Sequence, residues 1–220
     1  RVHRRQRQMC IRDRKKIINE SFDNKHVDVV LGGPDVGSDL LNLKWDYIFF
    51  TGSTQIGKIV AKKAAINLTP TTLELGGKNP CVVDEKVNLK VAVKRIVWGK
   101  FLNCGQTCIA PNFILCHKKN KDKFINLLID RLKKIYNSDS NKSINYSKII
   151  SSKHVDRLKN LVKGSKVVYG GRFNIKNKFF EPTIVEITNL QNKLLDEEIF
   201  GPILPIVQYN DESELYNILN

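Results

Sequence analysis

The sequence predicts an α/β protein in which short apolar strands alternate with amphipathic helices. Two kinds of segment support this class. Apolar runs such as residues 47–51 and 167–169 end at glycines, which is typical of buried strands. Residues 123–136 instead place apolar side chains at helical spacing, with lysines on the other face. This alternation favours a parallel or mixed sheet over a β-sandwich or a helical bundle.

The composition is that of a globular protein. The 220 residues allow one large domain or two small ones, at roughly 100–200 residues per domain. With 41% hydrophobic and 27% charged residues, wholesale disorder is excluded. No apolar run approaches the roughly 18–20 residues that a membrane-spanning helix needs.

The first part of the chain contains strand, turn and helix signals in order. Residues 27–31 are predicted to form a buried strand that ends at Gly32. Residues 47–51 predict a second strand, and a glycine-containing turn joins it to a helix over residues 55–67. Residues 71–74 are again expected to be extended, before Gly76 and Gly77 break the chain.

The second part repeats the alternation without an internal repeat. We expect helices over residues 88–101, 123–136 and 154–162. We expect strands around residues 81–83, 113–116, 167–169 and 183–185, and a polar loop over residues 137–145.

The basic charge is concentrated at the amino end. The first sixteen residues carry a net +7 of the total +15, and the rest is spread thinly. This stretch could be a nucleic-acid-binding arm or an arginine-rich transit sequence, but it lacks apolar periodicity. We interpret residues 1–16 as a disordered or artefactual extension and expect no nucleic-acid partner.

The cysteines indicate a reducing compartment. Five is an odd number, and a chain of this size does not depend on disulfides. Cys104 and Cys108 lie four residues apart, but the four histidines are scattered and complete no zinc-binding set. The sequence therefore predicts no metal site and a cytoplasmic location.

The segment from Gly52 to Gly57 follows a predicted strand and opens a predicted helix. Free amides at such a helix start can face an anion such as a cofactor pyrophosphate. The segment matches neither the dinucleotide-binding glycine pattern nor a phosphate-binding loop. By itself it is equally consistent with a plain helix start capped by Ser53 or Thr54.

Two further segments place reactive groups beside glycine turns. Cys108 follows such a turn and precedes a new element, so it could be an exposed nucleophile or a buried structural thiol. Glu74 lies in an apolar segment before Gly76, which suits a general base of raised pKa or an ordinary carboxylate paired with a lysine. The segment from Glu197 to Pro202 indicates by itself only a loop.

Taken together and in this order, these segments resemble the aldehyde dehydrogenase superfamily, from about Lys15 to Asn220. Glu74 precedes Cys108 by 34 residues, as in that family. Three strings are most similar to the class 3 and fatty aldehyde dehydrogenase branch: FTGST at residues 50–54, LTPTTLELGGK at residues 68–78 and WGKFLN at residues 98–103.

The resemblance implies a role for each matching residue. Cys108 would attack the aldehyde to give a thiohemiacetal and then a thioester, and Glu74 would activate the hydrolytic water. Cys104 would be a bystander, with a redox pair of Cys104 and Cys108 as the alternative. Contacts to NAD or NADP are implied for five residues: Gly52, Ser53 and Gly57 at the pyrophosphate, Glu198 at the nicotinamide ribose and Phe200 beside the nicotinamide.

The resemblance also implies the domain organisation. Residues 17–78 would form the C-terminal part of a Rossmann-type NAD(P)-binding domain, and residues 79–220 a truncated α/β catalytic domain. Family members are considerably longer, so we expect this chain alone to turn over little. The full-length protein is expected to be a homodimer that oxidises medium- to long-chain aliphatic aldehydes, with membrane anchoring only through a C-terminal segment beyond this chain.

Three alternatives remain. An acylating or reductive relative would pass the thioester to coenzyme A, whereas a base at Glu74 favours hydrolysis. A catalytically inactive homologue would have an unreactive Cys108. A nucleic-acid-binding protein would lose its affinity on deletion of residues 1–16.

Overall fold

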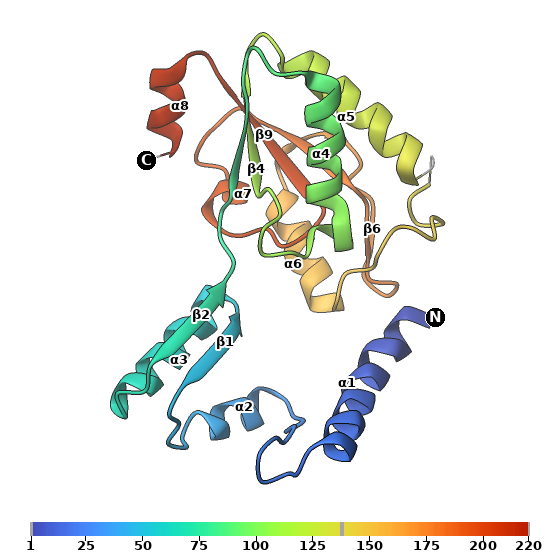
Figure 1. Ribbon diagram of the computed structural model, residues 1–220. Helices are drawn as coiled ribbons and strands as arrows, with labels where there is room; N and C mark the ends of the chain where they lie inside the picture. The colour runs from blue at the N-terminus through green and yellow to red at the C-terminus, as the bar shows by residue number, and fades with distance from the viewer. Residues whose placement is uncertain (1, 137–138, 220) are drawn as a thin grey trace. The chain divides into compact units, whose positions relative to one another are not determined.

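The computed structural model describes residues 2–136 and 139–219, and the backbone divides into two compact units, Arg1–Glu74 and Leu75–Asn220 (Figure 1). The division falls a few residues before the domain boundary expected at residue 78. Within the described residues, no helix combines the length and the apolar character needed to cross a membrane.

The first unit is built around a strand, a helix and a strand. Strand β1 (Ile48–Gly52) and strand β2 (Thr71–Leu75) are hydrogen-bonded neighbours, and helix α3 (Thr54–Ile66) connects them. Ser53 caps this helix, since its hydroxyl accepts a hydrogen bond from the Ile56 amide. These elements confirm the strand, turn and helix predicted from the sequence.

Two other segments of this unit differ from the sequence prediction. Helix α1 (Val2–Ser21) runs through the stretch expected to be disordered, because arginine, lysine and glutamine are good helix formers. Residues 27–31 form no strand, which corrects that prediction. A strand needs a hydrogen-bonding neighbour, and among the described residues none pairs with this segment. Helix α2 (Pro34–Leu40) follows directly, with proline in its first turn.

The second unit alternates helices and strands as predicted. Its helices are α4 (Leu89–Phe101), α5 (Lys121–Tyr136), α6 (Ser152–Val162), α7 (Lys193–Asp196) and α8 (Glu212–Leu219), with a short 3-10 turn η1 (Leu102–Gly105). Its strands are β3 (Pro80–Val83), β4 (Phe113–His117), β5 (Lys166–Tyr169), β6 (Phe173–Asn174), β7 (Phe179–Phe180), β8 (Thr183–Ile187) and β9 (Ile203–Tyr209). Part of the predicted loop, residues 137 and 138, lies outside the described residues. The sequence prediction missed α7, α8, β6, β7 and β9.

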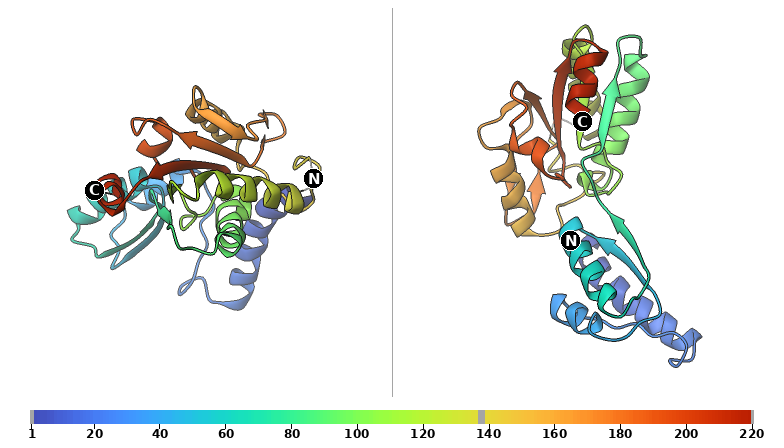
Figure 2. Two further views of the ribbon diagram at one scale, coloured as in Figure 1. Left: turned by 90° about the horizontal axis from the view of Figure 1, so that it is seen from above. Right: turned by 90° about the vertical axis from the view of Figure 1, so that its left-hand side faces the viewer.

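Five of these strands form one mixed sheet in the order β3-β4-β9-β8-β5. Strands β3, β4, β9 and β8 run parallel to one another, and β5 pairs antiparallel with β8. Figures 1 and 2 show α4 and α5 on one face of the sheet and α6 on the other. A sheet covered on both faces has buried strands, and β4 is buried throughout.

Substitution of Leu128 tests the assignment of the core of this unit. Its side chain is fully buried on α5, so Leu128→Ala should lower the free energy of unfolding by about 2–5 kcal/mol, since it leaves a cavity. The matched control is Leu190→Ala, because Leu190 is 52% exposed. Urea unfolding of both variants measures the difference, and equal effects would contradict this assignment of the core.

Candidate active site

Three segments that precede neighbouring parallel strands meet at one edge of the sheet. Residues 76–79 precede β3, residues 103–112 precede β4 and residues 197–202 precede β9. Because these strands are parallel and adjacent in the order β3-β4-β9, their amino ends lie side by side. The topology thus brings Cys108, Glu198 and Phe200, all predicted site residues, to the same edge.

The segment before Cys108 is a left-handed turn. Asn103, Cys104 and Gly105 have φ values of 50°, 60° and 72°, so three consecutive residues lie in the left-handed region. A side chain at Gly105 would overlap the backbone carbonyl of Gly201. The glycine therefore allows the turn before the nucleophile to lie directly against the loop that carries Glu198 and Phe200.

Two amide side chains hold this turn in place. The Gln106 amide nitrogen donates to the carbonyls of Asn103 (2.9 Å) and Lys148 (3.2 Å), and its oxygen accepts from the Ile150 amide (2.8 Å). On the other side, Asn79 Nδ2 donates to the carbonyls of Cys108 (2.7 Å) and Ala110 (3.2 Å). The backbone around the candidate nucleophile is thereby fixed from two directions.

The two cysteines of this segment have opposite environments. The Cys108 side chain is exposed, as a nucleophile must be, whereas Cys104 is fully buried. Burial raises the pKa of Cys104 to about 12, although a hydrogen bond to Tyr146 opposes the shift. Cys104 is therefore a structural thiol that contacts Tyr146.

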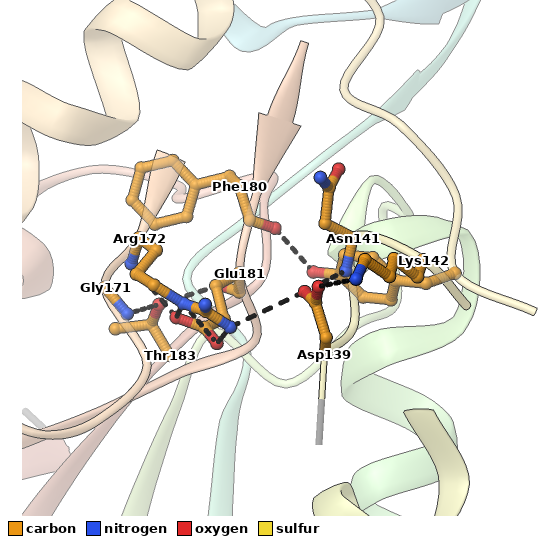
Figure 3. Close-up of polar contacts among 9 residues, drawn as sticks. Asp139, Asn141, Lys142, Gly171, Arg172, Phe180, Glu181 and Thr183 are labelled. Atoms are coloured by element: carbon orange, nitrogen blue, oxygen red, sulfur yellow. Dashed lines mark hydrogen bonds and ion pairs between the residues drawn. The ribbon is translucent and has the colours of Figure 1, made fainter. Parts of the chain in front are cut away.

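Tyr146 belongs to a loop that an ionic network holds in place. Its hydroxyl donates to the Phe180 carbonyl (2.7 Å), and the neighbouring Glu181 carboxylate is buried and pairs with Arg172 (2.7 Å). Arg172 also approaches Asp139 at 3.7 Å, which ties the start of the loop to the same place (Figure 3). The contacts run from this network through Tyr146 to Cys104.

Glu198 lies against the glycines before β3. Its carboxylate accepts a hydrogen bond from the Gly77 amide, and it occupies the space that a side chain at Gly76 would fill. Partial burial raises the pKa of Glu198, while the Gly77 bond and then Arg157 and Lys100 lower it. Gly76 thus leaves room for this carboxylate, and Gly77 supplies a hydrogen-bond donor to it.

Phe200 lines a cavity of this unit. The cavity measures about 700 Å³, and its walls include His154, Arg157, Lys193 and Glu197. The Phe200 backbone is left-handed, with a φ of 46°, and its side chain is 37% exposed. An exposed ring in a cavity with both apolar and charged walls suits a planar ligand group.

Lys100 is a buried lysine that was not identified from the sequence. It is 1% exposed in the last turn of α4, and burial lowers its pKa to about 7, opposed by the nearby Cys104 and Glu198. Its sequence signals were its position on the apolar face of a predicted helix and its place in the string WGKFLN. Asn79, Gln106 and Asn112 were also missed, because a single amide in a turn follows no periodic pattern.

The remaining predicted residues lie in the first unit. Gly52 ends β1, Ser53 caps α3, and Gly57 is buried on α3 with its amide bonded to the Ser53 carbonyl. Glu74 lies in β2 between Leu73 and Leu75, which point to the other face, so its side chain is exposed and the expected apolar setting is not present. The pyrophosphate and general-base roles stay predictions.

The part of the chain that the structure describes contains no group of three or more His, Cys, Asp or Glu side chains that could hold a metal ion. The acidic and sulfur ligands at the sheet edge, Glu198 and Cys108, are accompanied by amides and glycines instead. These donors suit an organic ligand with carbonyl, hydroxyl or amide groups.

Comparison with known proteins gives a consistent result over nearly the whole chain. The sequence matches the model of the Aldehyde dehydrogenase family over residues 14–220. It is 43% identical over 202 residues to 4,4'-diaponeurosporen-aldehyde dehydrogenase of Staphylococcus aureus, covering 91% of this chain and 44% of that protein. It is 41% identical to Aldehyde dehydrogenase family 3 member A2 of Rattus norvegicus, covering 93% of this chain and 42% of that protein.

Solved structures agree with these sequence matches. The substrate-bound state of Staphylococcus aureus AldH superposes with a TM-score of 0.90 at 42% identity, over 94% of this chain and 46% of that one. An aldehyde dehydrogenase of Mycobacterium tuberculosis complexed with NAD+ superposes with a TM-score of 0.77 at 30% identity, over 86% and 41%. The chain spans less than half the length of these relatives, and with the family match over residues 14–220 it belongs to the aldehyde dehydrogenase family.

Proposed function

We propose that the protein carrying this chain oxidises an aldehyde to the carboxylic acid, with NAD or NADP as hydride acceptor and Cys108 as nucleophile. One observation supports this most strongly. An exposed cysteine lies at the sheet edge where Glu198 and Phe200 also meet, in a member of the aldehyde dehydrogenase family.

Cys108 carries the first half of the reaction in this proposal. Its thiolate adds to the aldehyde carbon, and the Cys108 backbone amide donates to the oxygen that gains the negative charge. The bonds from Asn79 to the Cys108 and Ala110 carbonyls keep that backbone in position. After loss of hydride, the acyl group remains on the sulfur as a thioester.

Glu74 acts in the second half of the reaction in this proposal, the hydrolysis of the thioester. Its carboxylate takes a proton from water, the resulting hydroxide attacks the thioester carbon, and the Cys108 thiolate leaves. Its exposed side chain at the end of β2 is accessible to water. Hydrolysis needs a base because water at neutral pH is a poor nucleophile. A base at Glu74 therefore favours hydrolysis over transfer of the acyl group to coenzyme A.

Five residues are proposed to contact the cofactor. Gly52 and Ser53 precede the first turn of α3, where free amides can face a pyrophosphate, and Gly57 lies in that helix with its own amide bonded to the Ser53 carbonyl. Glu198 can accept from ribose hydroxyls, with Phe200 beside the nicotinamide. When bound, the dinucleotide supplies the acceptor for the hydride that leaves the substrate carbon. A relative from Canis lupus familiaris is named dimeric and NADP-preferring, so NADP and a homodimer remain within the proposal.

An aliphatic substrate fits the surface near Cys108. Trp98, Leu102 and Ile109 are 69%, 47% and 83% exposed, and the turn after Cys108 lies against α4, since Pro111 is 3.7 Å from the place of a Gly99 side chain. Exposed apolar side chains that precede and follow a nucleophile in the sequence, on elements in contact with each other, suit a medium- to long-chain aldehyde. The Staphylococcus aureus relative is named for 4,4'-diaponeurosporen-aldehyde.

Selective alkylation of Cys108 tests the nucleophile. Substoichiometric iodoacetamide at pH 7–9 should modify Cys108 before Cys104 and Cys116, because burial raises the pKa of each of these two to about 12 and keeps them uncharged. Added NAD should slow the modification. Peptide mass spectrometry gives the site, and Cys108→Ser is the control. Labelling of Cys104 as fast as Cys108 in the folded chain would overturn the assignment.

Glu74→Gln separates hydrolysis from the earlier steps. In the complete enzyme, with octanal and NAD, this variant should release a first equivalent of NADH and then stall as a thioester on Cys108, with turnover reduced about 100-fold or more. Mass spectrometry detects the added acyl group. Cys108→Ser should give neither NADH nor adduct. Unchanged steady-state turnover in Glu74→Gln, or rapid turnover only with coenzyme A, would favour the acylating alternative.

Gly76→Ala tests the place of Glu198. The added methyl group would overlap the Glu198 carboxylate and displace it, so NAD should protect Cys108 from iodoacetamide less well. Gly37→Ala is the matched control, because nothing lies within 4 Å of the place its side chain would take. Equal protection by NAD in both variants would argue against a cofactor contact at Glu198.

A further inference from the structure

The loop from Glu197 to Phe200 has no regular structure, yet each of its four backbone carbonyls accepts a hydrogen bond from a side chain. Asn112 Nδ2 donates to the Glu197 carbonyl (3.2 Å), and His154 Nε2 donates to the Phe200 carbonyl (2.7 Å). Arg157 donates to the two carbonyls between them, through Nη1 to Glu198 (3.4 Å) and Nη2 to Ile199. Side chains thus supply the donors that a neighbouring strand would provide in a sheet.

Two more contacts fix the loop on both sides. The Ile199 amide donates to Asn112 Oδ1 (2.8 Å), so this buried asparagine bonds the loop twice, and Arg157 pairs with the Glu197 carboxylate (3.3 Å). Asn112 approaches from the segment before β4, whereas His154 and Arg157 approach from α6. The loop is held between these two elements.

His154 and Arg157 act together. A carbonyl can only accept, so His154 Nε2 carries the proton, and Nδ1 is then free to accept from Arg157 Nε at 3.2 Å. This pairing requires a neutral ring. Burial lowers the pKa of His154, the Phe200 carbonyl opposes this and Arg157 adds to it, which keeps the ring neutral near pH 7.

The loop needs such support because Phe200 is strained. Its φ of 46° lies in the left-handed region, which an aromatic residue adopts only when its surroundings impose it. The bond from His154 is to the Phe200 carbonyl itself, and the two rings pack edge to face with centroids 6.3 Å apart.

We propose that Asn112, His154 and Arg157 form a loop clamp, whose function is to position Glu198 and Phe200 for the cofactor. The inference deepens the proposed function and rests on it only for the identity of the ligand. None of the three side chains was identified from the sequence. The Asn112 backbone amide also donates to the Asn79 carbonyl, and the Asn79 side chain donates to the Cys108 carbonyl. The clamp thus connects the loop of residues 197–200 to the turn that carries Cys108.

Hydrogen exchange tests the clamp in the chain itself. Arg157→Ala and His154→Phe should speed exchange of the amides at residues 197–201 about tenfold or more, because the lost bonds no longer oppose opening of the loop. Exchange in β4 and α5 should not change. His154→Gln should restore protection, since its amide can donate to the Phe200 carbonyl, whereas Arg157→Lys should not, since one ammonium cannot replace the planar fork.

Lys159→Ala is the matched control, because Lys159 lies on the same helix but contacts Asp156, in an exposed ion pair, and the Phe173 ring rather than the loop. Unchanged exchange at residues 197–201 in both Arg157→Ala and His154→Phe would overturn the clamp. Faster exchange across the whole unit, or failure of His154→Gln to restore protection, would also overturn it in favour of a general structural role.

Alkylation separates this proposal from the proposed function. Clamp variants should require several-fold more NAD to protect Cys108 from iodoacetamide, with the rate of alkylation unchanged when NAD is left out. Equal NAD requirements in parent and variants, with the loop loosened, would overturn the positioning role. Lack of any NAD protection in the parent would instead contradict the proposed function, while the exchange data still decide whether the loop is clamped.

Discussion

The parallel pairing of β3, β4 and β9 is the constraint on which the candidate site depends. It places the amino ends of three strands side by side, so segments more than 100 residues apart in the sequence share one edge. Reversal of any one strand would move its preceding segment to the opposite edge. The contacts of Asn79 with Cys108, of Asn112 with Ile199 and of Glu198 with Gly77 all follow from this alignment.

The edge of the sheet formed by the amino ends of the strands differs from the opposite edge in the hydrogen-bond partners available to the backbone. In open parallel sheets ligands usually bind at the carboxyl ends of strands, where helix starts offer free amides. At the opposite edge the chain enters each strand from a turn, and its carbonyls need donors from elsewhere. Here Asn79, Gln106, Asn112 and Arg157 supply them, and the left-handed residues Cys104 and Phe200 are held by bonds to Tyr146 and His154. Residues with strained backbone and the hydrogen bonds that stabilise them therefore lie together at this edge.

The sequence was sufficient for features with a periodic or motif signal. The alternation of strand and helix and the glycine turns were predicted correctly, and the family resemblance is confirmed. Strand β9 was missed although it is central, because Pro205 argues against a central strand. Residues 27–31 were wrongly assigned, because their β-rich composition says nothing about a pairing partner. The clamp residues were missed because their role depends on contacts 41–87 positions away in sequence.

The division of the chain also separates the two halves of the proposed chemistry. Cys108, Glu198 and Phe200, which we propose act in the formation of the thioester, belong to one compact unit whose turns are fixed by buried amides. Glu74, which we propose acts in its hydrolysis, is the last residue of the other unit and lies on the exposed face of β2. A nucleophile must be held close to its productive place, because a misplacement of about 1 Å can cost about 100-fold in rate. The rigid contacts are accordingly concentrated around the cysteine.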